Sequence, residues 1–228
     1  MRLELAAATA LLAAVLVYGY RRETTRQRNW QQALLNCPCV PAEACDKRIE
    51  PDGYPALVGT VSGYPFEIKL ARDDVTVRKV PCLWLCVSVR ARLPSCPTLD
   101  ILARMRGTEF YSPLTTLPHR IEPLPGWPQE LTLKCSSPQG PLLALSTWVP
   151  EYFSDPCAKE LLVTPGGVRL VHQFAQARRP EYLVLRAGHF DTGPAPSELL
   201  QELLSRALTV IRTLSTHDSQ SESAQASA

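Results

Sequence analysis

The chain has 228 residues, of which 45% are hydrophobic and 20% are charged, a composition that is ordinary for a globular protein. The formal net charge of +2 provides no general attraction to nucleic acid, so a nucleic-acid-binding function is not expected. The 21 prolines are scattered between apolar segments, which favours a loop-rich fold with short strands over a bundle of long helices.

The N-terminal segment from Leu5 to Tyr20 carries no charged residue. As a helix, these about 16 residues span roughly 24 Å, somewhat less than a hydrocarbon core of about 30 Å. Aromatic and basic residues at its end can sit at the membrane interface and extend this length. The predicted membrane-interface residues are Tyr18, Tyr20, Arg21 and Arg22.

Three interpretations of this segment compete. A cleaved signal peptide requires a small-x-small cleavage site, and Val17-Tyr18-Gly19 is a poor one. A buried core helix is the second alternative, but a run that is apolar on all sides rarely serves as a core element at the start of a chain. We therefore favour an uncleaved single transmembrane anchor over residues 1–22.

The charges that flank the anchor predict its orientation. After the apolar run the arginines outnumber the acidic residues, and the positive-inside rule places such a flank in the cytoplasm. The main domain is therefore expected on the cytoplasmic side of the inner membrane, where the eight cysteines stay reduced thiols. The expected partners are membrane lipid, which the basic flank can contact, and a protein held near the membrane. The flanking arginines are Arg21, Arg22, Arg26 and Arg28.

Residues 23–53 are predicted to form a juxtamembrane helix, which continues to residue 36, followed by a linker. The stretch "CPCVPAEACDKRIEPDGY" combines proline, cysteine and charge without periodicity, which is typical of a linker. The folded domain is expected over residues 54–215.

The first half of this domain shows strand patterns. "ALVGTVSG" and "PFEIKLA" alternate in polarity and predict a hairpin around Gly63-Tyr64. "CLWLCVSVRARL" alternates over twelve residues, with Leu83, Leu85 and Val87 on one face and the other face expected to pack its cysteines and tryptophan under a helix. "LDILAR" and "LTLKC" indicate two further short strands.

The second half combines helices and strands. "PLLALSTWVPEYF" predicts a helix that begins at Pro141, "KELLVTPGGVRLVHQF" predicts two strands around a tight turn, and "EYLVLRAG" predicts a third strand. Ser197 is expected to cap a strong helix. Residues 216–228 are predicted to be a disordered tail. The order of elements predicts an α+β fold, with an antiparallel sheet covered by helices and preceded by a single transmembrane helix. The apolar face of the C-terminal helix consists of Leu200, Leu203, Leu204, Ala207, Leu208, Ile211 and Leu214.

Cysteines are the first candidates for chemistry. Cys37, Cys39 and Cys45 have the spacing C-x-C-x5-C, whose thiolates could ligate zinc or copper. A tetrahedral site needs a fourth ligand, and no cysteine or histidine stands close in the sequence. Ordinary linker cysteines are therefore the favoured interpretation.

A cysteine nucleophile is the second candidate. Cys157 could pair with His172 or His189, although the strand face of His172 favours a hydrogen-bonded core histidine. The segment with His189 could be a surface cluster or a contact between elements. For Glu109, Glu122 and Glu160 the sequence indicates no pairing. None of the standard catalytic or nucleotide-binding motifs occurs.

Four motifs are similar to those of a family of uncharacterised bacterial proteins with an N-terminal anchor. They are G-x-x-x-G before a strand, V-P-x-L-W-L, R-x-x-G-x-E-F and K-E-L-x-x-T-x-x-G-x-R, and the resemblance covers residues 53–190. It implies an anchored protein whose motifs serve turns and strands, and it carries no catalytic residue or cofactor over to this chain.

The sequence therefore predicts a non-catalytic, membrane-anchored binding or scaffold protein without a cofactor. The alternatives are a cysteine-dependent metal-binding or redox accessory protein, and a hydrolase or transferase whose site assembles only in the folded chain.

Overall fold

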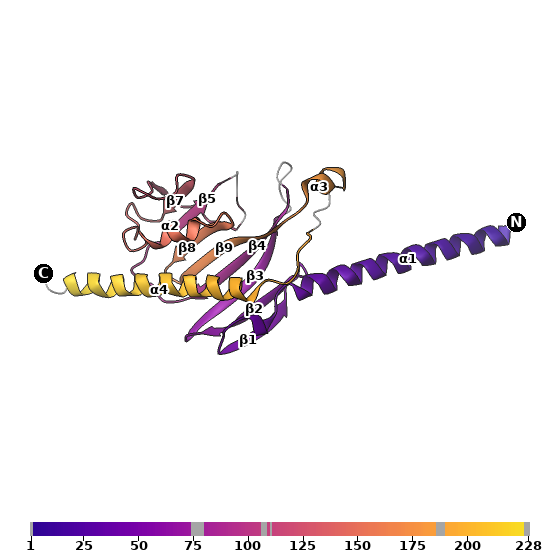
Figure 1. Ribbon diagram of the computed structural model, residues 1–228, viewed down its shortest axis with the longest axis horizontal. Helices are drawn as coiled ribbons and strands as arrows, with labels where there is room; N and C mark the ends of the chain where they lie inside the picture. The colour runs from indigo at the N-terminus through magenta and orange to yellow at the C-terminus, as the bar shows by residue number, and fades with distance from the viewer. Residues whose placement is uncertain (1, 74–79, 106–108, 110, 186–189, 226–228) are drawn as a thin grey trace.

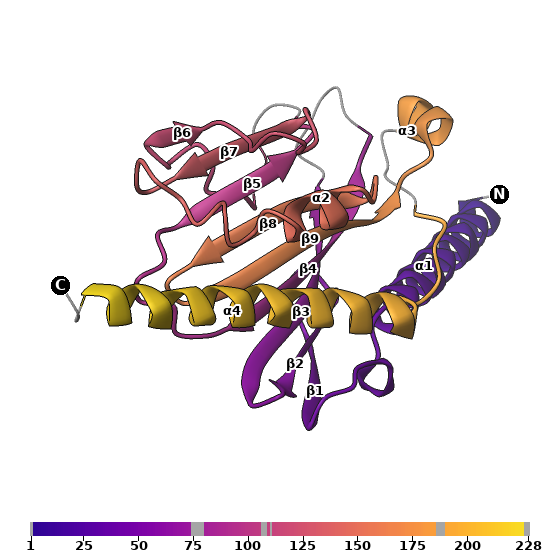
Figure 2. The same ribbon diagram turned by 60° about the vertical axis from the view of Figure 1, so that its left-hand side comes forward.

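The computed structural model describes residues 2–73, 80–105, 109, 111–185 and 190–225. Within them, nine strands form one sheet in the order β1-β2-β3-β4-β9-β8-β5-β7-β6, and all neighbouring strands are antiparallel. Helix α4 lies across one sheet face, and α1 projects away from the domain (Figures 1 and 2). The prediction of an α+β fold with an antiparallel sheet and covering helices is confirmed.

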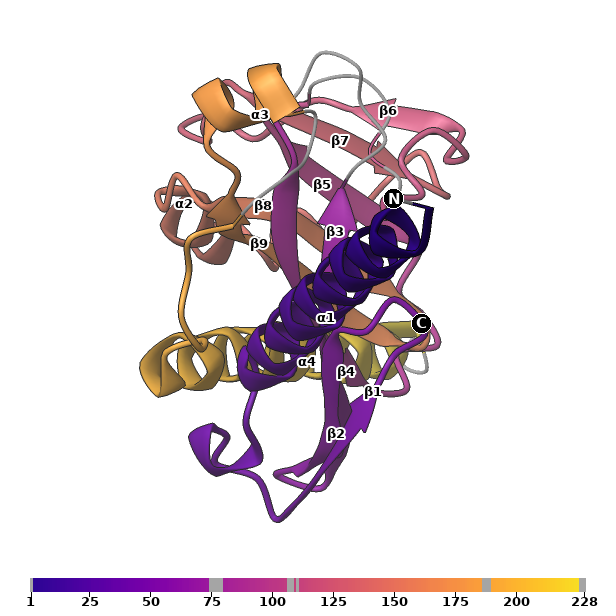
Figure 3. The same ribbon diagram turned by 90° about the vertical axis from the view of Figure 1, so that its right-hand side faces the viewer.

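In chain order the elements are α1 (Arg2–Ala33), the short 3-10 helix η1 (Cys37–Cys39), β1 (Ala44–Ile49), β2 (Pro55–Val61), β3 (Tyr64–Asp73), β4 (Cys82–Arg90), β5 (Leu99–Ala103), β6 (His119–Ile121), β7 (Leu131–Cys135), α2 (Trp148–Phe153), β8 (Ala158–Thr164), β9 (Gly167–Gln176), α3 (Arg179–Leu185) and α4 (Ser197–Gln225). Figure 3 shows the two ends of the sheet, with β6 and β7 at the top and β1 and β2 at the bottom.

Both predicted hairpins form. Val61 pairs with Tyr64, so Ser62 and Gly63 make a two-residue turn, one position earlier than expected. Their φ angles of 51° and 77° are those that such a turn needs to match the twist of its strands. In the β8–β9 turn, Gly167 has a φ of 140°, and a Cβ there would lie 2.2 Å from the carbonyl oxygen of Val89.

The main core lies between the sheet and the helices α2 and α4. The predicted apolar face of β4 is buried there, and so are all seven apolar residues predicted for α4. The opposite face of β4 forms a smaller cluster in which Trp84 and Cys86 pack with Val171. Tyr111, in a loop, lies against this cluster, so the predicted helical cover is wrong and a loop replaces it.

The predicted linker over residues 37–53 is wrong in part. Its residues 44–49 form β1, an edge strand that pairs with β2, and η1 precedes it. Five of the six side chains of β1 are exposed, so the strand has no apolar alternation to reveal it. The pairing with β2 supplies its backbone hydrogen bonds, and the folded domain begins before Tyr54.

Three predictions for the second half also need correction. Residues 179–185 form the helix α3 instead of a strand, because a short apolar run does not separate the two by periodicity. Helix α2 begins at Trp148 instead of Pro141, which places Pro150 in the first turn, where no intrahelical amide bond is lost. Helix α4 continues to Gln225, so most of the predicted disordered tail is helical, since extending a formed helix costs little.

Helix α1 unites the predicted anchor with the predicted juxtamembrane helix and ends at Ala33. Its last turns dock on the domain. The indole nitrogen of Trp30 donates a 2.8 Å hydrogen bond to the Thr192 carbonyl, and Leu34 and Leu35 are buried. Among the described side chains, which in α1 begin at Leu11, none of the helices combines the length and the apolar character needed to cross a bilayer.

Candidate functional site

A polar cleft of about 740 Å³ lies on the Trp84 face of the sheet, opposite α4. Side chains at the ends of β3, β4, β8 and β9 and in the loop after β5 line it, so residues far apart in the sequence meet there. Several of them are charged. The lining includes Asp73, Cys82, Trp84, Arg104, Glu109, Cys157, Lys159 and Gln173.

An irregularity in β8 brings two charged residues to this face. Ala158 pairs with His172 and Glu160 pairs with the adjacent Val171, so Lys159 is one extra residue in the strand. Such a bulge breaks the alternation of faces. Lys159 and Glu160 are thereby both turned toward the Trp84 face, where each finds a partner of opposite charge.

Lys159 joins the loop after β5 to the sheet. Its ammonium group donates hydrogen bonds of 2.8 Å to the Ala103 carbonyl and 2.9 Å to the Arg104 carbonyl, and it lies 3.2 Å from Glu109. It also lies over the Trp84 ring, 5.9 Å from its centroid. Lys159 and Glu109 are both only 6% exposed, so this is a buried ion pair. The contacts of Lys159 tie Ala103, Arg104 and Glu109 to the sheet.

Glu160 and Asp100 form the second buried group. Arg169 donates two hydrogen bonds, of 3.0 and 3.1 Å, to the two oxygens of Glu160 and a third, of 2.5 Å, to the Tyr111 carbonyl. The hydroxyl of Ser112 donates a 2.5 Å hydrogen bond to Asp100. Both carboxyl groups are fully buried, and both interact electrostatically with Arg169.

Burial decides the protonation of these two carboxyls. It raises the pKa of Glu160 to about 8, against the opposing effect of Arg169 and with a further rise from the nearby Asp100. Burial likewise raises the pKa of Asp100 to about 6, although the bond from Ser112 acts against the rise. Because two buried carboxyls face one guanidinium, the group keeps a proton near neutral pH.

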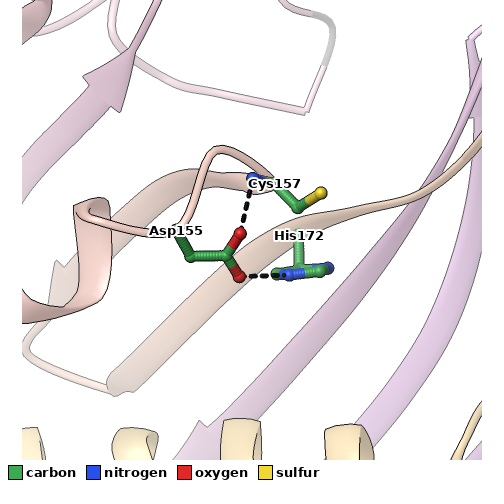
Figure 4. Close-up of side chains that lie close together, drawn as sticks. All are labelled: Asp155, Cys157 and His172. Carbon is green, nitrogen blue, oxygen red and sulfur yellow. Dashed lines mark hydrogen bonds and ion pairs between the residues drawn. The ribbon is translucent and has the colours of Figure 1, made fainter.

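A cluster of three other residues lies at the edge of the cleft. The two carboxylate oxygens of Asp155 face the backbone nitrogen of Cys157, at 2.7 Å, and Nε2 of His172, at 2.9 Å (Figure 4). His172 is 6% exposed, whereas the side chain of Asp155 is about half-exposed. Burial raises the pKa of Asp155, but the hydrogen bonds from Cys157 and His172 outweigh it, so the pKa lies below its ordinary value.

The predicted nucleophile is thus partly assembled. Pairing of β8 with β9 brings Cys157 and His172 together, and His172 is a buried, hydrogen-bonded histidine, as the sequence favoured. His189 lies outside the described residues. Burial, with a further contribution from Asp155, raises the pKa of the Cys157 thiol. A protonated thiol is the opposite of an activated nucleophile.

The predicted metal ligands are placed only in part. The side chain of Cys37 hydrogen-bonds to the Cys45 thiol, and burial together with this contact raises the pKa of Cys45 to about 12. The side chain of Cys39 lies outside the described residues. The predicted membrane-interface residues Tyr18, Tyr20, Arg21 and Arg22 are all exposed on α1.

Sequence reasoning missed the carboxylate partners. Glu109 and Glu160, for which no pairing was indicated, pair with Lys159 and Arg169, whereas Glu122 is exposed. The signal in the sequence was limited: two of the quoted motifs carry these charges, but neither motif indicates which charges pair. On this sheet face the two motifs place Arg104, Glu109, Lys159, Glu160 and Arg169 together with Trp84 of a third motif.

No protein-family model matches the chain, and neither the curated proteins nor the solved structures include a similar protein.

Proposed function

We propose that the protein is a membrane-anchored, non-catalytic binding or scaffold protein of the inner membrane, with α1 inserted in the lipid and the domain on the cytoplasmic side. The observation that carries this proposal is a set of large apolar side chains of α1 that are 52–69% exposed. They are Leu11, Leu12, Val15, Leu16, Val17 and Tyr18.

These side chains lie on all sides of the helix. Val15 to Tyr18 are four consecutive exposed residues, which together make a full turn of a helix with 3.6 residues per turn. An amphipathic helix that lies on a membrane or on a partner protein has one apolar face, whereas apolar residues all round favour complete immersion. The helix also projects away from the domain, so the domain does not cover them (Figure 1).

The charges of α1 support the orientation. Arg21, Arg22, Arg26 and Arg28 follow the apolar segment and are exposed, where they can contact anionic headgroups. Trp30 and Leu34, which dock on the domain, follow within about four helical turns of Tyr20, where the apolar segment ends. The domain is therefore held close to the lipid surface, and a protein that also lies at the membrane is the expected partner for it.

Membrane insertion predicts that two aspartates in the apolar segment detach the protein from lipid. The full chain is reconstituted into phosphatidylethanolamine–phosphatidylglycerol vesicles, washed with alkaline carbonate and floated. The wild type should float with the lipid, and L12D/L16D should be released, because each aspartate in the bilayer centre costs about 3 kcal/mol relative to leucine. The control T25D/Q27D adds the same charges to the same helix beyond the apolar segment and should float. Release of the wild type by carbonate would contradict insertion.

A separate experiment in cells tests the orientation. A membrane-impermeant thiol reagent applied to intact spheroplasts should label the protein only after the inner membrane is opened, since Cys37, Cys45 and Cys157 are partly exposed on the domain. Labelling from the outside would reverse the proposed topology and leave the anchor itself unaffected.

A second candidate function is cysteine-dependent metal binding, and the contact between the Cys37 and Cys45 thiols favours it. If this site holds a metal, purified protein should contain about one equivalent of zinc or copper that C37S/C39S/C45S lacks. Equal metal content in the variant and the wild type, measured by mass spectrometry, would remove this candidate.

A further inference from the structure

Three side chains with different metal-ligating atoms meet between α2 and the β8–β9 hairpin. A carboxylate oxygen of Asp155, the sulfur of Cys157 and an imidazole nitrogen of His172 all lie within 4.8 Å of one another (Figure 4). A cation at the centre of such a triangle can reach all three atoms at ordinary bond lengths of about 2.0–2.3 Å after small adjustments. Oxygen, sulfur and nitrogen donors together suit zinc and its neighbours in the first transition row.

We propose that Asp155, Cys157 and His172 form a binding site for a divalent transition-metal ion of the Zn²⁺ type. This inference is independent of the membrane role proposed above, and its residues are separate from Cys37, Cys39 and Cys45.

The local structure holds the three ligands in place. Asp155 and Cys157 stand in one turn, which is fixed by the bond from the Cys157 amide to the Asp155 carboxylate. The guanidinium of Arg104 fixes the same turn by donating to the carbonyls of Pro156, at 2.9 Å, and of Ala158. Ala158 is the strand partner of His172, so the turn and the imidazole are held relative to each other. Such outer support is typical of metal sites.

The charges and protons balance for a divalent cation. In the free protein a hydrogen bond of 2.9 Å joins Nε2 of His172 to Asp155, and the metal takes the place of that proton. The ring proton then moves to Nδ1, a buried atom without a hydrogen-bond partner among the described residues. The thiol releases its proton to water, and the thiolate and the carboxylate together neutralise the two charges of the ion.

The site has three protein ligands, and its fourth position is open. Cys157 lines the polar cleft, so a water molecule or a ligand in the cleft can complete the coordination. Three protein ligands plus an open position is the arrangement of zinc sites that bind or activate a ligand, whereas closed structural sites have four. The bound ion would then act as a Lewis acid in the cleft that Arg104 and Lys159 also line.

Cobalt titration of the full chain in detergent tests the site, because Co²⁺ substitutes for Zn²⁺ and a thiolate ligand gives a charge-transfer absorption band. The variant C37S/C39S/C45S serves as the background, so that the N-terminal thiols cannot produce the band. We expect one equivalent of Co²⁺ to bind with the band present, and Zn²⁺ to abolish the band by displacement. Adding C157S should remove the band. Loss of an outer partner of a ligand weakens metal binding by about 10–100-fold. D155N removes a direct ligand, so it should weaken Co²⁺ binding by about 100-fold or more.

Cys82 provides the matched control, because it also lines the cleft and is partly exposed but is outside the cluster. C82S should keep both the band and the affinity. H172N alters a buried residue, so its result counts only if its circular dichroism equals that of the background. The partly exposed C157S and D155N are the decisive variants. Absence of Co²⁺ binding, a band that survives C157S, or a band that C82S removes would each overturn the proposal.

Discussion

Replacing Arg169 by methionine is expected to lower the free energy of unfolding at pH 7 by about 3 kcal/mol or more, because several buried acceptors lose their donor. The guanidinium supplies donors to both oxygens of Glu160 and to the carbonyl of Tyr111. Methionine fills a similar volume but leaves these acceptors without a donor next to a carboxyl group that is 0% exposed. Each buried acceptor left unpaired costs about 1–3 kcal/mol. Urea denaturation followed by circular dichroism measures the change.

Arg206 is a close control for this experiment. Its side chain is 24% exposed and that of Arg169 is 25% exposed, and both pair with glutamates. The partners of Arg206, Glu151 and Glu202, are 71% and 56% exposed, whereas Glu160 is buried. R206M should therefore cost less than about 1 kcal/mol. If R169M and R206M lower the free energy of unfolding equally, the burial of the glutamate partner does not control the loss of stability.

The second large effect is a loss of stability with rising pH. The folded protein holds a proton on Glu160 up to a pH of about 8, whereas the unfolded chain releases it near 4.5. Between these values the folded state binds more protons than the unfolded state, so the free energy of unfolding falls as the pH rises. Asp100 adds a fall between 3.8 and about 6. The contribution is fully present below these ranges and lost above them.

The size of this effect follows from the shift of Glu160. Each tenfold change in a proton equilibrium is worth about 1.4 kcal/mol, so the carboxyl group should remove a few kcal/mol of stability between pH 5 and about 8. E160Q, which cannot ionise, should remove most of the slope, and the exposed Glu122, replaced in E122Q, should leave it unchanged. Denaturation at a series of pH values gives the slope. A wild-type slope equal to that of E160Q would show that Glu160 is ionised in the folded protein throughout this range.

Both effects rest on residues whose grouping sequence patterns could not indicate. Lys159 and Glu160 are neighbours, and in a regular strand neighbouring side chains point to opposite faces. The bulge turns both toward the Trp84 face, and it depends on how β8 pairs with β9. Asp100 joins the group because β5 pairs with β8, and Ser112 joins it through its hydrogen bond to Asp100.

The Asp155–Cys157–His172 cluster was predictable in part. The sequence offers Cys157 with His172 or His189 as a candidate nucleophile pair. The register that places Ala158 opposite His172 is not available from the pattern, and no pattern points to Asp155, because its place in the cluster depends on a turn after α2. The cysteines of β4 were assigned to the correct face, although the element that covers them was not.

The sequence by itself determined the strands with regular alternation, the buried face of α4 and the apolar character of α1. These features depend on periodicity within one segment, and burial against a single partner surface is enough to enforce that pattern. Only the tertiary structure decided that residues 44–49 are a strand, that residues 179–185 are a helix, and that the charged residues of two motifs pair on one face of the sheet. An exposed edge strand receives its hydrogen bonds from its neighbour, a short apolar run fits either backbone, and a buried ion pair exists only when separate elements bring opposite charges together.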